Sequence, residues 1–87
     1  MKYVAKVHKV LRPRIHKLVT QQDGSITTAE MPLPDFVEIE ENLHNAMLYR
    51  YQNDGTFCGD SWHGNLASAK AQARYEYGTL ESDWRVE

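Results

Sequence analysis

The chain has 87 residues, of which 41% are hydrophobic and 25% charged, with a formal net charge of −2; this predicts one small globular domain, residues 1–87. Its single cysteine excludes an intramolecular disulfide and a zinc site built on several cysteines. No apolar run is long enough for a signal peptide or a membrane-spanning helix, so we expect a cytoplasmic protein.

Residues 3–11 alternate loosely between apolar and basic side chains, which predicts a half-buried strand that ends near Pro13. Residues 1–19 contain six basic side chains and no acid, whereas residues 20–60 contain eight acids and a single base, Arg50. Either the basic segment binds nucleic acid, or a basic strand lies beside an acidic strand and the charges pair across the sheet. The pairing hypothesis, which we favour, predicts contacts between two sets of side chains: Lys6, Lys9 and Arg12, and Glu38, Glu40 and Glu41.

Residues 13–33 are expected to leave the body of the domain as a protruding hairpin or loop. Residues 15–19 and 26–30 can supply two strands, because residues 20–25 between them have turn chemistry around Asp23-Gly24. The Met-Pro-Leu-Pro sequence that follows favours an extended connection back to the sheet.

The sequence predicts three further strands, over residues 35–41, 46–52 and 56–62. Asn53-Asp54-Gly55 between the last two is the strongest hairpin signal in the chain. Tyr49 and Tyr51 lie on one face of their strand, and we expect this aromatic stripe to face the core, since such stripes are usually buried.

A helix is expected over residues 66–77, because Asn65 is a good N-cap and Gly78 stands where a left-handed C′ residue belongs. Ala71 and Tyr75 form a second, smaller apolar line that we expect to face another element or a partner. A larger apolar stripe that leaves Glu76 outside should face the sheet; it comprises Leu66, Ala69, Ala73, Tyr77 and Leu80.

Trp84 and Val86 alternate like a short edge strand or a clasp over the helix. Strands clustered ahead of one helix predict an α+β fold. In this fold, a small, meander-like antiparallel sheet of three to four strands packs on one C-terminal helix.

A block of the sequence combines a hairpin signal with a helix, and its motifs are Leu48-Tyr49-Arg50-Tyr51, Asp54-Gly55, Gly59-Asp60-Ser61-Trp62-His63 and Glu76-Tyr77-Gly78. The block resembles a group of short bacterial proteins of no assigned activity that share a DG…GD[ST]WH…A…QA…[EY][FY]G pattern followed by a tryptophan. The resemblance does not extend to residues 1–34. It implies a hairpin followed by a helix and a bacterial cytoplasmic source, and it carries no catalytic residue.

Residues 58–63 bring a thiol, a carboxylate, a hydroxyl and an imidazole within six positions. Nucleophilic catalysis would need Cys58 or Ser61 within hydrogen-bond reach of His63. On a strand, Cys58 and His63 point to opposite faces, and the Cβ atoms of Ser61 and His63 would be about 6–7 Å apart. We therefore expect a structural segment, with Cys58 in the core and Trp62 packed beneath the helix.

No metal site and no cofactor are expected. None of the histidines is paired at helical spacing, and the distance between the first two fits no compact ligand motif. The four histidines are His8, His16, His44 and His63.

The sequence predicts a non-catalytic protein-interaction module that self-associates. A first alternative is a nucleic-acid-binding domain that uses residues 2–17; Tyr49 and Tyr51 would support it if the helix does not cover their face. A second alternative is a small enzyme that uses Asp60, Ser61 and His63. The expected partner contacts are Lys6, Lys9, Arg12, Arg14, Ala71, Tyr75 and Trp84.

Overall fold

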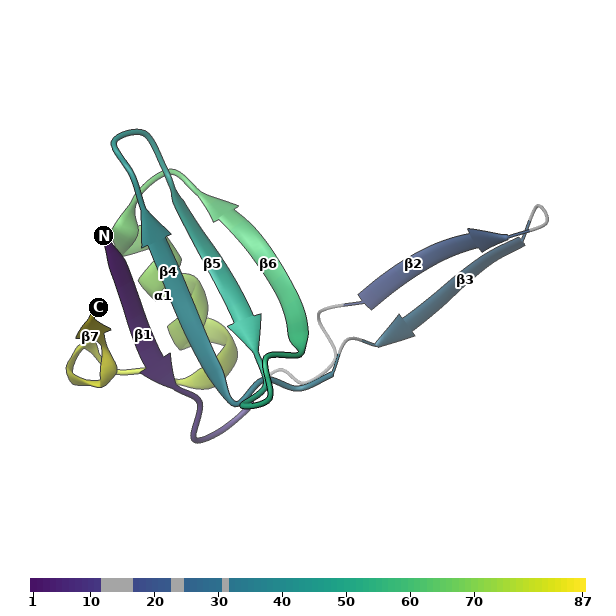
Figure 1. Ribbon diagram of the computed structural model, residues 1–87, viewed down its shortest axis with the longest axis horizontal. Coiled ribbons are helices and arrows are strands. Elements are labelled where there is room, and N and C mark those ends of the chain that lie inside the picture. Colours follow the sequence, from purple (N-terminus) through teal and green to yellow (C-terminus); the bar gives the residue numbers. More distant parts are fainter. Residues whose placement is uncertain (12–16, 23–24, 31) are drawn as a thin grey trace.

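The computed structural model describes residues 1–11, 17–22, 25–30 and 32–87, with side chains for residues 1–11 and 32–87. One helix packs on one face of a five-stranded antiparallel sheet (Figure 1), which confirms the α+β class. The strands of this sheet are β1 (Lys2–Lys6), β4 (Phe36–Glu41), β5 (Ala46–Tyr51), β6 (Phe57–His63) and β7 (Arg85–Val86). Their order across the sheet is β6-β5-β4-β1-β7, so the short β7 adds the edge strand predicted from the C-terminal alternation.

Two further strands, β2 (Lys17–Gln22) and β3 (Ser25–Glu30), form a separate antiparallel ribbon. The ribbon extends away from the main sheet (Figure 1), so the excursion contains a protruding hairpin. Its strands reach further toward the turn than predicted, because residues 20–22 and 25 belong to the ladder. The predicted turn residues Asp23-Gly24 lie outside the described residues.

The helix α1 (Leu66–Tyr77) begins and ends where the sequence predicts. The Asn65 side chain accepts a hydrogen bond of 2.8 Å from the backbone N–H of Ser68. At the other end Gly78 adopts a left-handed conformation with φ of 68°, and its N–H donates to the carbonyl of Arg74. Within the described part of the chain, no helix is long and apolar enough to cross a membrane.

The core lies between α1 and one face of the sheet. Two predictions about the helix are wrong: Leu80 is 56% exposed, and Glu76 is fully buried. Leu80 follows the left-handed turn at Gly78, so helical spacing no longer applies to it, whereas Glu76 stands three residues after Ala73 on the buried stripe. The buried cluster consists of Ala5, Val37, Ile39, Ala46, Leu48, Ala69, Ala73 and Tyr77.

The first strand is shorter than predicted and ends at Lys6 instead of residue 11. Lys6 pairs with Phe36, the first residue of β4, and after one more hydrogen bond, from the backbone N–H of Val7 to the carbonyl of Asp35 at 2.9 Å, the ladder ends. Beyond this point the backbone N–H of Leu11 donates to the carbonyl of Glu76 at 2.7 Å. The segment after β1 therefore leaves the sheet and reaches the C-terminal end of α1.

Replacing Gly78 with alanine should lower the free energy of unfolding by about 1–2 kcal/mol, because a Cβ is strained in the left-handed conformation. The added Cβ would lie 3.5 Å from Leu11 Cδ1, an ordinary contact, so the backbone is the source of the loss. Urea unfolding followed by circular dichroism measures it. Gly64→Ala is the matched control, since Gly64 has no positive φ and its Cβ would meet open space. Equal losses in both variants would contradict the prediction.

Candidate protein-interaction site

Strand alternation determines which side chains α1 leaves uncovered. In β5, Leu48 and Arg50 are buried on the helix side, so Tyr49 and Tyr51 point to the opposite face. Figure 1 shows this opposite face in front, with α1 behind the sheet. We call it the open face; its side chains are Lys2, Val4, Lys6, Phe36, Glu38, Glu40, Met47, Tyr49, Tyr51, Phe57, Asp60, Trp62 and Arg85.

The strand register arranges these side chains in three rows across the sheet. The first row is Trp62, Met47, Glu40 and Lys2. The second row is Asp60, Tyr49, Glu38, Val4 and Arg85. The third row is Phe57, Tyr51, Phe36 and Lys6.

The three rings of the third row form a continuous aromatic strip. Ring centroids lie 5.5 Å apart for Phe36 and Tyr51 and 6.1 Å apart for Tyr51 and Phe57, and Tyr49 lies 6.3 Å from Tyr51. Phe57 is 46% exposed and Trp62 is 64% exposed. The predictions that the tyrosines face the core and that Trp62 packs beneath the helix are wrong, because α1 covers the other face.

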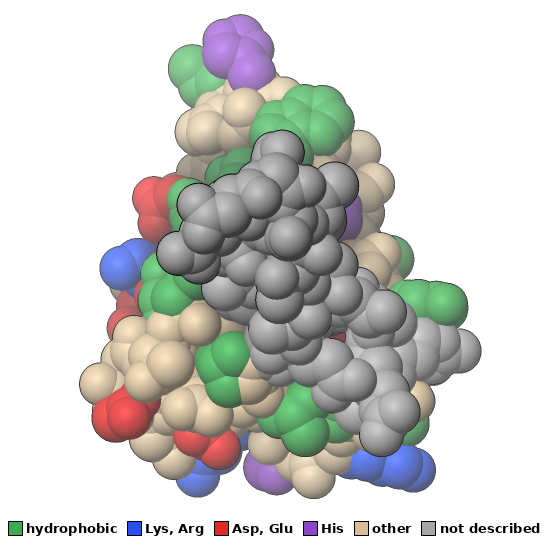
Figure 2. Space-filling view, turned by 90° about the vertical axis from the view of Figure 1, so that its right-hand side faces the viewer, with side chains coloured by type: hydrophobic (Ala, Val, Ile, Leu, Met, Phe, Trp, Pro, Cys, Tyr) green, Lys and Arg blue, Asp and Glu red, His purple; other side chains and the backbone are tan. Residues whose placement is uncertain are grey.

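Carboxylates surround the tyrosines of the open face. Glu38 and Asp60 are the cross-strand neighbours of Tyr49 on either side. Burial, and then the nearby Glu38 carboxylate, raises the pKa of the Tyr51 phenol. Figure 2 presents the open face along its left side, where acidic and basic side chains lie among hydrophobic ones.

The predicted pairing of the basic strand with the acidic strand holds in part. β1 does lie beside β4, and Lys2 Nζ is 3.7 Å from Glu38 Oε1. Within the described residues, neither Lys6 nor Lys9 lies within ion-pair distance of an acid, so the predicted contacts of these two are wrong. Two of the proposed partner contacts, Arg12 and Arg14, fall outside the described residues.

A fully buried ion pair connects the sheet to the helix on the covered face. Arg50 Nε donates to Glu76 Oε1 at 2.9 Å, and its terminal NH2 donates to Oε2 at 2.6 Å. Both side chains are 0% exposed. Gln72 adds a donor at 2.6 Å to the same carboxylate. This two-pronged geometry is the strong form of an arginine–carboxylate contact.

A chain of hydrogen bonds leads from the ion pair toward the surface through Ser61 and His63. Arg50 donates to Ser61 Oγ at 3.1 Å, and Ser61 Oγ lies 2.7 Å from His63 Nε2. Since the hydroxyl accepts from arginine, its own proton is directed at the imidazole. Burial, and then the Arg50 charge, lowers the pKa of His63, which favours the neutral ring. The prediction that Ser61 and His63 stand too far apart is wrong, but Asp60 points to the open face, so the predicted trio does not assemble.

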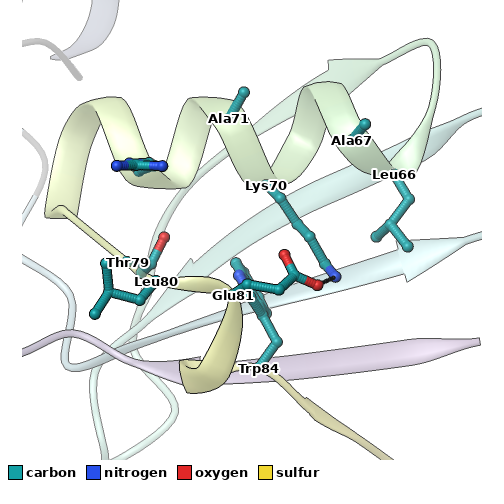
Figure 3. A pocket seen from close by; sticks show the side chains of 9 residues that line it. Leu66, Ala67, Lys70, Ala71, Thr79, Leu80, Glu81 and Trp84 are labelled. Carbon is teal, nitrogen blue, oxygen red and sulfur yellow. Dashed lines mark hydrogen bonds and ion pairs between the residues drawn. The ribbon is translucent and has the colours of Figure 1, made fainter.

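A groove of about 410 Å³ lies between α1 and η1 (Glu81–Asp83) (Figure 3). Of the predicted partner contacts, Ala71 and Trp84 line it together, whereas Tyr75 is 52% exposed on α1 outside the lining. An ion pair of 2.6 Å between Lys70 Nζ and Glu81 Oε1 crosses the groove. A polar bridge therefore already spans this groove.

The thiol of Cys58 is not poised for reaction. It is 1% exposed, as the predicted core position requires, and burial raises its pKa. In the part of the chain that the structure describes, no three His, Cys, Asp or Glu side chains could hold a metal ion together.

No family model matches the chain, and neither a curated protein nor a solved structure matches it. The resemblance to short bacterial proteins therefore stays a prediction. Sequence reasoning missed the Arg50–Glu76 pair and the exposure of Trp62. A signal for the pair was available, because Arg50 is the only base among residues 20–60 and Glu76 falls three residues after Ala73 on the helix.

Replacing Glu76 with alanine should lower the free energy of unfolding by about 3–5 kcal/mol, because it leaves the Arg50 guanidinium buried without its carboxylate. The double variant Arg50→Met with Glu76→Leu should lose less, since it removes both charges. Urea unfolding measures all variants, and Glu81→Ala, which breaks an exposed pair, should cost less than about 1 kcal/mol. A double variant less stable than Glu76→Ala would contradict the assignment.

Protonation of His63 should destabilise the fold at mildly acidic pH. Its pKa is lowered in the folded state, so the unfolded chain takes up this proton first as the pH falls. The stabilising contribution is complete above about pH 6.5, the ordinary value for histidine, and declines below it until the folded-state pKa is passed. The urea midpoint should therefore fall more between pH 7.5 and pH 5 in the wild type than in His63→Gln. Identical drops would show that the imidazole does not carry this dependence.

Proposed function

We propose that this domain is a non-catalytic protein-interaction module of the bacterial cytoplasm that binds its partner through the open face. The observation that supports this most is the exposure of Trp62, at 64%, on a face that also carries the aromatic strip. An antiparallel sheet with one solvated face usually presents polar side chains there. Aromatic side chains gathered on an uncovered surface are typical of binding sites, where they supply much of the affinity.

The edges of the sheet are poorly suited to binding a further strand, which favours the open face as the binding surface. Next to β6 the ladder shifts register between Tyr49 and Tyr51, and Gly59 has a φ of 113° in this bulge. At the other edge β7 has only two residues. Bulges and very short edge strands both hinder the addition of a further strand.

Nucleic-acid binding is the second candidate, because Tyr49 and Tyr51 do lie on a sheet face that the helix leaves open. Base stacking on such a face needs basic groups nearby to attract phosphates. Here Glu38 and Asp60 flank Tyr49, and the ammonium of Lys2 is paired with Glu38. The exposed cations Lys6 and Arg85 lie on β1 and β7, beyond β4 from the tyrosines. The two carboxylates would repel phosphates, so a protein partner fits the face better.

We assign Ser61 and His63 a structural role. Both extend the hydrogen-bond network that begins at the buried Arg50–Glu76 pair, and Arg50 already donates to the Ser61 hydroxyl. Their contact joins β6 to the network that anchors the helix. We therefore do not propose catalysis through this pair.

Photocrosslinking in bacterial cells tests the open face. A benzoylphenylalanine placed at Trp62 or at Phe57 should give a discrete protein adduct, whose partner mass spectrometry identifies. Leu43, which is 96% exposed at the turn between β4 and β5, is the matched control and should give none. With the purified partner, Trp62→Ser should weaken binding by about 30-fold, the loss typical of a tryptophan that contributes strongly to an interface.

Two outcomes would contradict the proposal. Equal adducts from all three positions would show that the open face is not selective. An adduct that nuclease removes would replace the protein partner with nucleic acid, in favour of the second candidate.

A further inference from the structure

The two halves of the open face carry opposite charge. On the β1–β7 side, Lys2 and Lys6 flank Val4 along the strand, and Arg85 is its cross-strand neighbour. On the β6–β5 side, the one charged group is Asp60, set among aromatic rings. Cations on the outer strands of one side, and aromatic rings with a carboxylate on the other, are complementary when one copy is turned over onto another.

We infer that the partner of the open face is a second copy of this chain, packed face to face about a two-fold axis that runs along the strands between β4 and β5. This inference rests on the proposed function and names its partner. Two sheets in face-to-face contact keep their strands within about 30° of each other, so the three rows stay nearly in register. In this arrangement β1 of one copy lies over β6 of the other, and β4 lies over β5.

Each row then meets a complementary row. In the third row, the Lys6 ammonium lies over the ring of Phe57 in the second copy, and Tyr51 lies over Phe36. In the second row, Asp60 lies over Val4 and therefore among the three surrounding cations. Cations over aromatic faces and carboxylates among cations are both attractive contacts.

The acids at the centre of the face do not oppose each other. Because the axis runs between β4 and β5, Glu38 meets Tyr49 of the second copy, whose phenol can donate to the carboxylate. Glu40 meets Met47 in the same way. An axis through β4 would instead place Glu38 over Glu38, which like-charge repulsion disfavours.

Two of the three cations of the β1–β7 side are available for such contacts, whereas Lys2 is already paired with Glu38. Lys6 and Arg85 are exposed and share a hollow of about 360 Å³ with Asp83. The Asp83 carboxylate accepts a hydrogen bond of 2.7 Å from the backbone N–H of Leu80, and within the described residues it forms no ion pair with either cation. The face spans roughly 20 Å along and across the strands, which places the dimer at the small end of specific interfaces and predicts reversible association.

A charge-swap experiment tests the second copy. Asp60→Lys and Arg85→Glu should each weaken the dimer by about tenfold or more. In each variant the reversed side chain faces a charge of its own sign in the second copy, and the two-fold axis repeats this repulsion. An equimolar mixture of the two variants should restore association, because every reversed charge then meets its complement. Sedimentation velocity over a concentration series measures the association, and circular dichroism checks that each variant is folded. Arg74→Glu, a reversed exposed charge on α1 away from the open face, is the control and should change nothing.

Failure of this inference differs from failure of the proposed function. A wild type that stays monomeric, or a mixture that does not recover, overturns the second copy as the partner. If crosslinks from Trp62 then identify another protein, the open face remains the binding surface. Loss of association in Arg74→Glu alone would place the contact on the helix side and overturn both.

Discussion

The structure depends on the buried contact between Arg50 and Glu76. Its two hydrogen bonds join the end of β5 to the last turn of α1, and both side chains are 0% exposed. The core around it is built largely of alanines and small aliphatic side chains, which specify a helix position only loosely. A charge pair without water has almost no tolerance for displacement, since either group alone in the core is strongly unfavourable. The pair therefore determines where the helix lies on the sheet.

The same contact determines the chemistry of the opposite face. Neighbouring residues of a strand point to opposite faces, so directing Arg50 toward the helix directs Tyr49 and Tyr51 away from it. In β6, Ser61 accepts from Arg50 and so Trp62 also faces outward. The aromatic open face is thus a geometric consequence of the buried pair. A sheet that buried its tyrosines would have to expose the arginine and abandon the carboxylate on α1.

The sequence was sufficient for the helix and for the hairpins, because those depend on local signals: the Asn65 cap, the Gly78 terminus and the Asp54-Gly55 turn. It was not sufficient to decide which face of β5 the helix covers. Alternation separates Leu48 and Arg50 from Tyr49 and Tyr51, and hydrophobicity alone favours burial of the tyrosines. The long-range pair with the helix decided otherwise. The Ser61–His63 contact was missed for a different reason, since Cβ separation on a strand understates how far an imidazole reaches.

The arrangement of the described elements leaves one face of the sheet open. One helix of 12 residues covers a single face of the five-stranded sheet, and residues 17–22 and 25–30 form a ribbon outside the body. Among the described residues no other helix or strand covers the second face, so its aromatic rings are accessible to another molecule. Because a partner would bind the folded sheet and not the unfolded chain, its binding would also stabilise the fold by mass action. The charges interleaved with the rings limit unspecific association of this surface, since a partner must match their signs as well as the apolar area. Under the proposed function, stability and recognition are therefore coupled through one surface of the sheet.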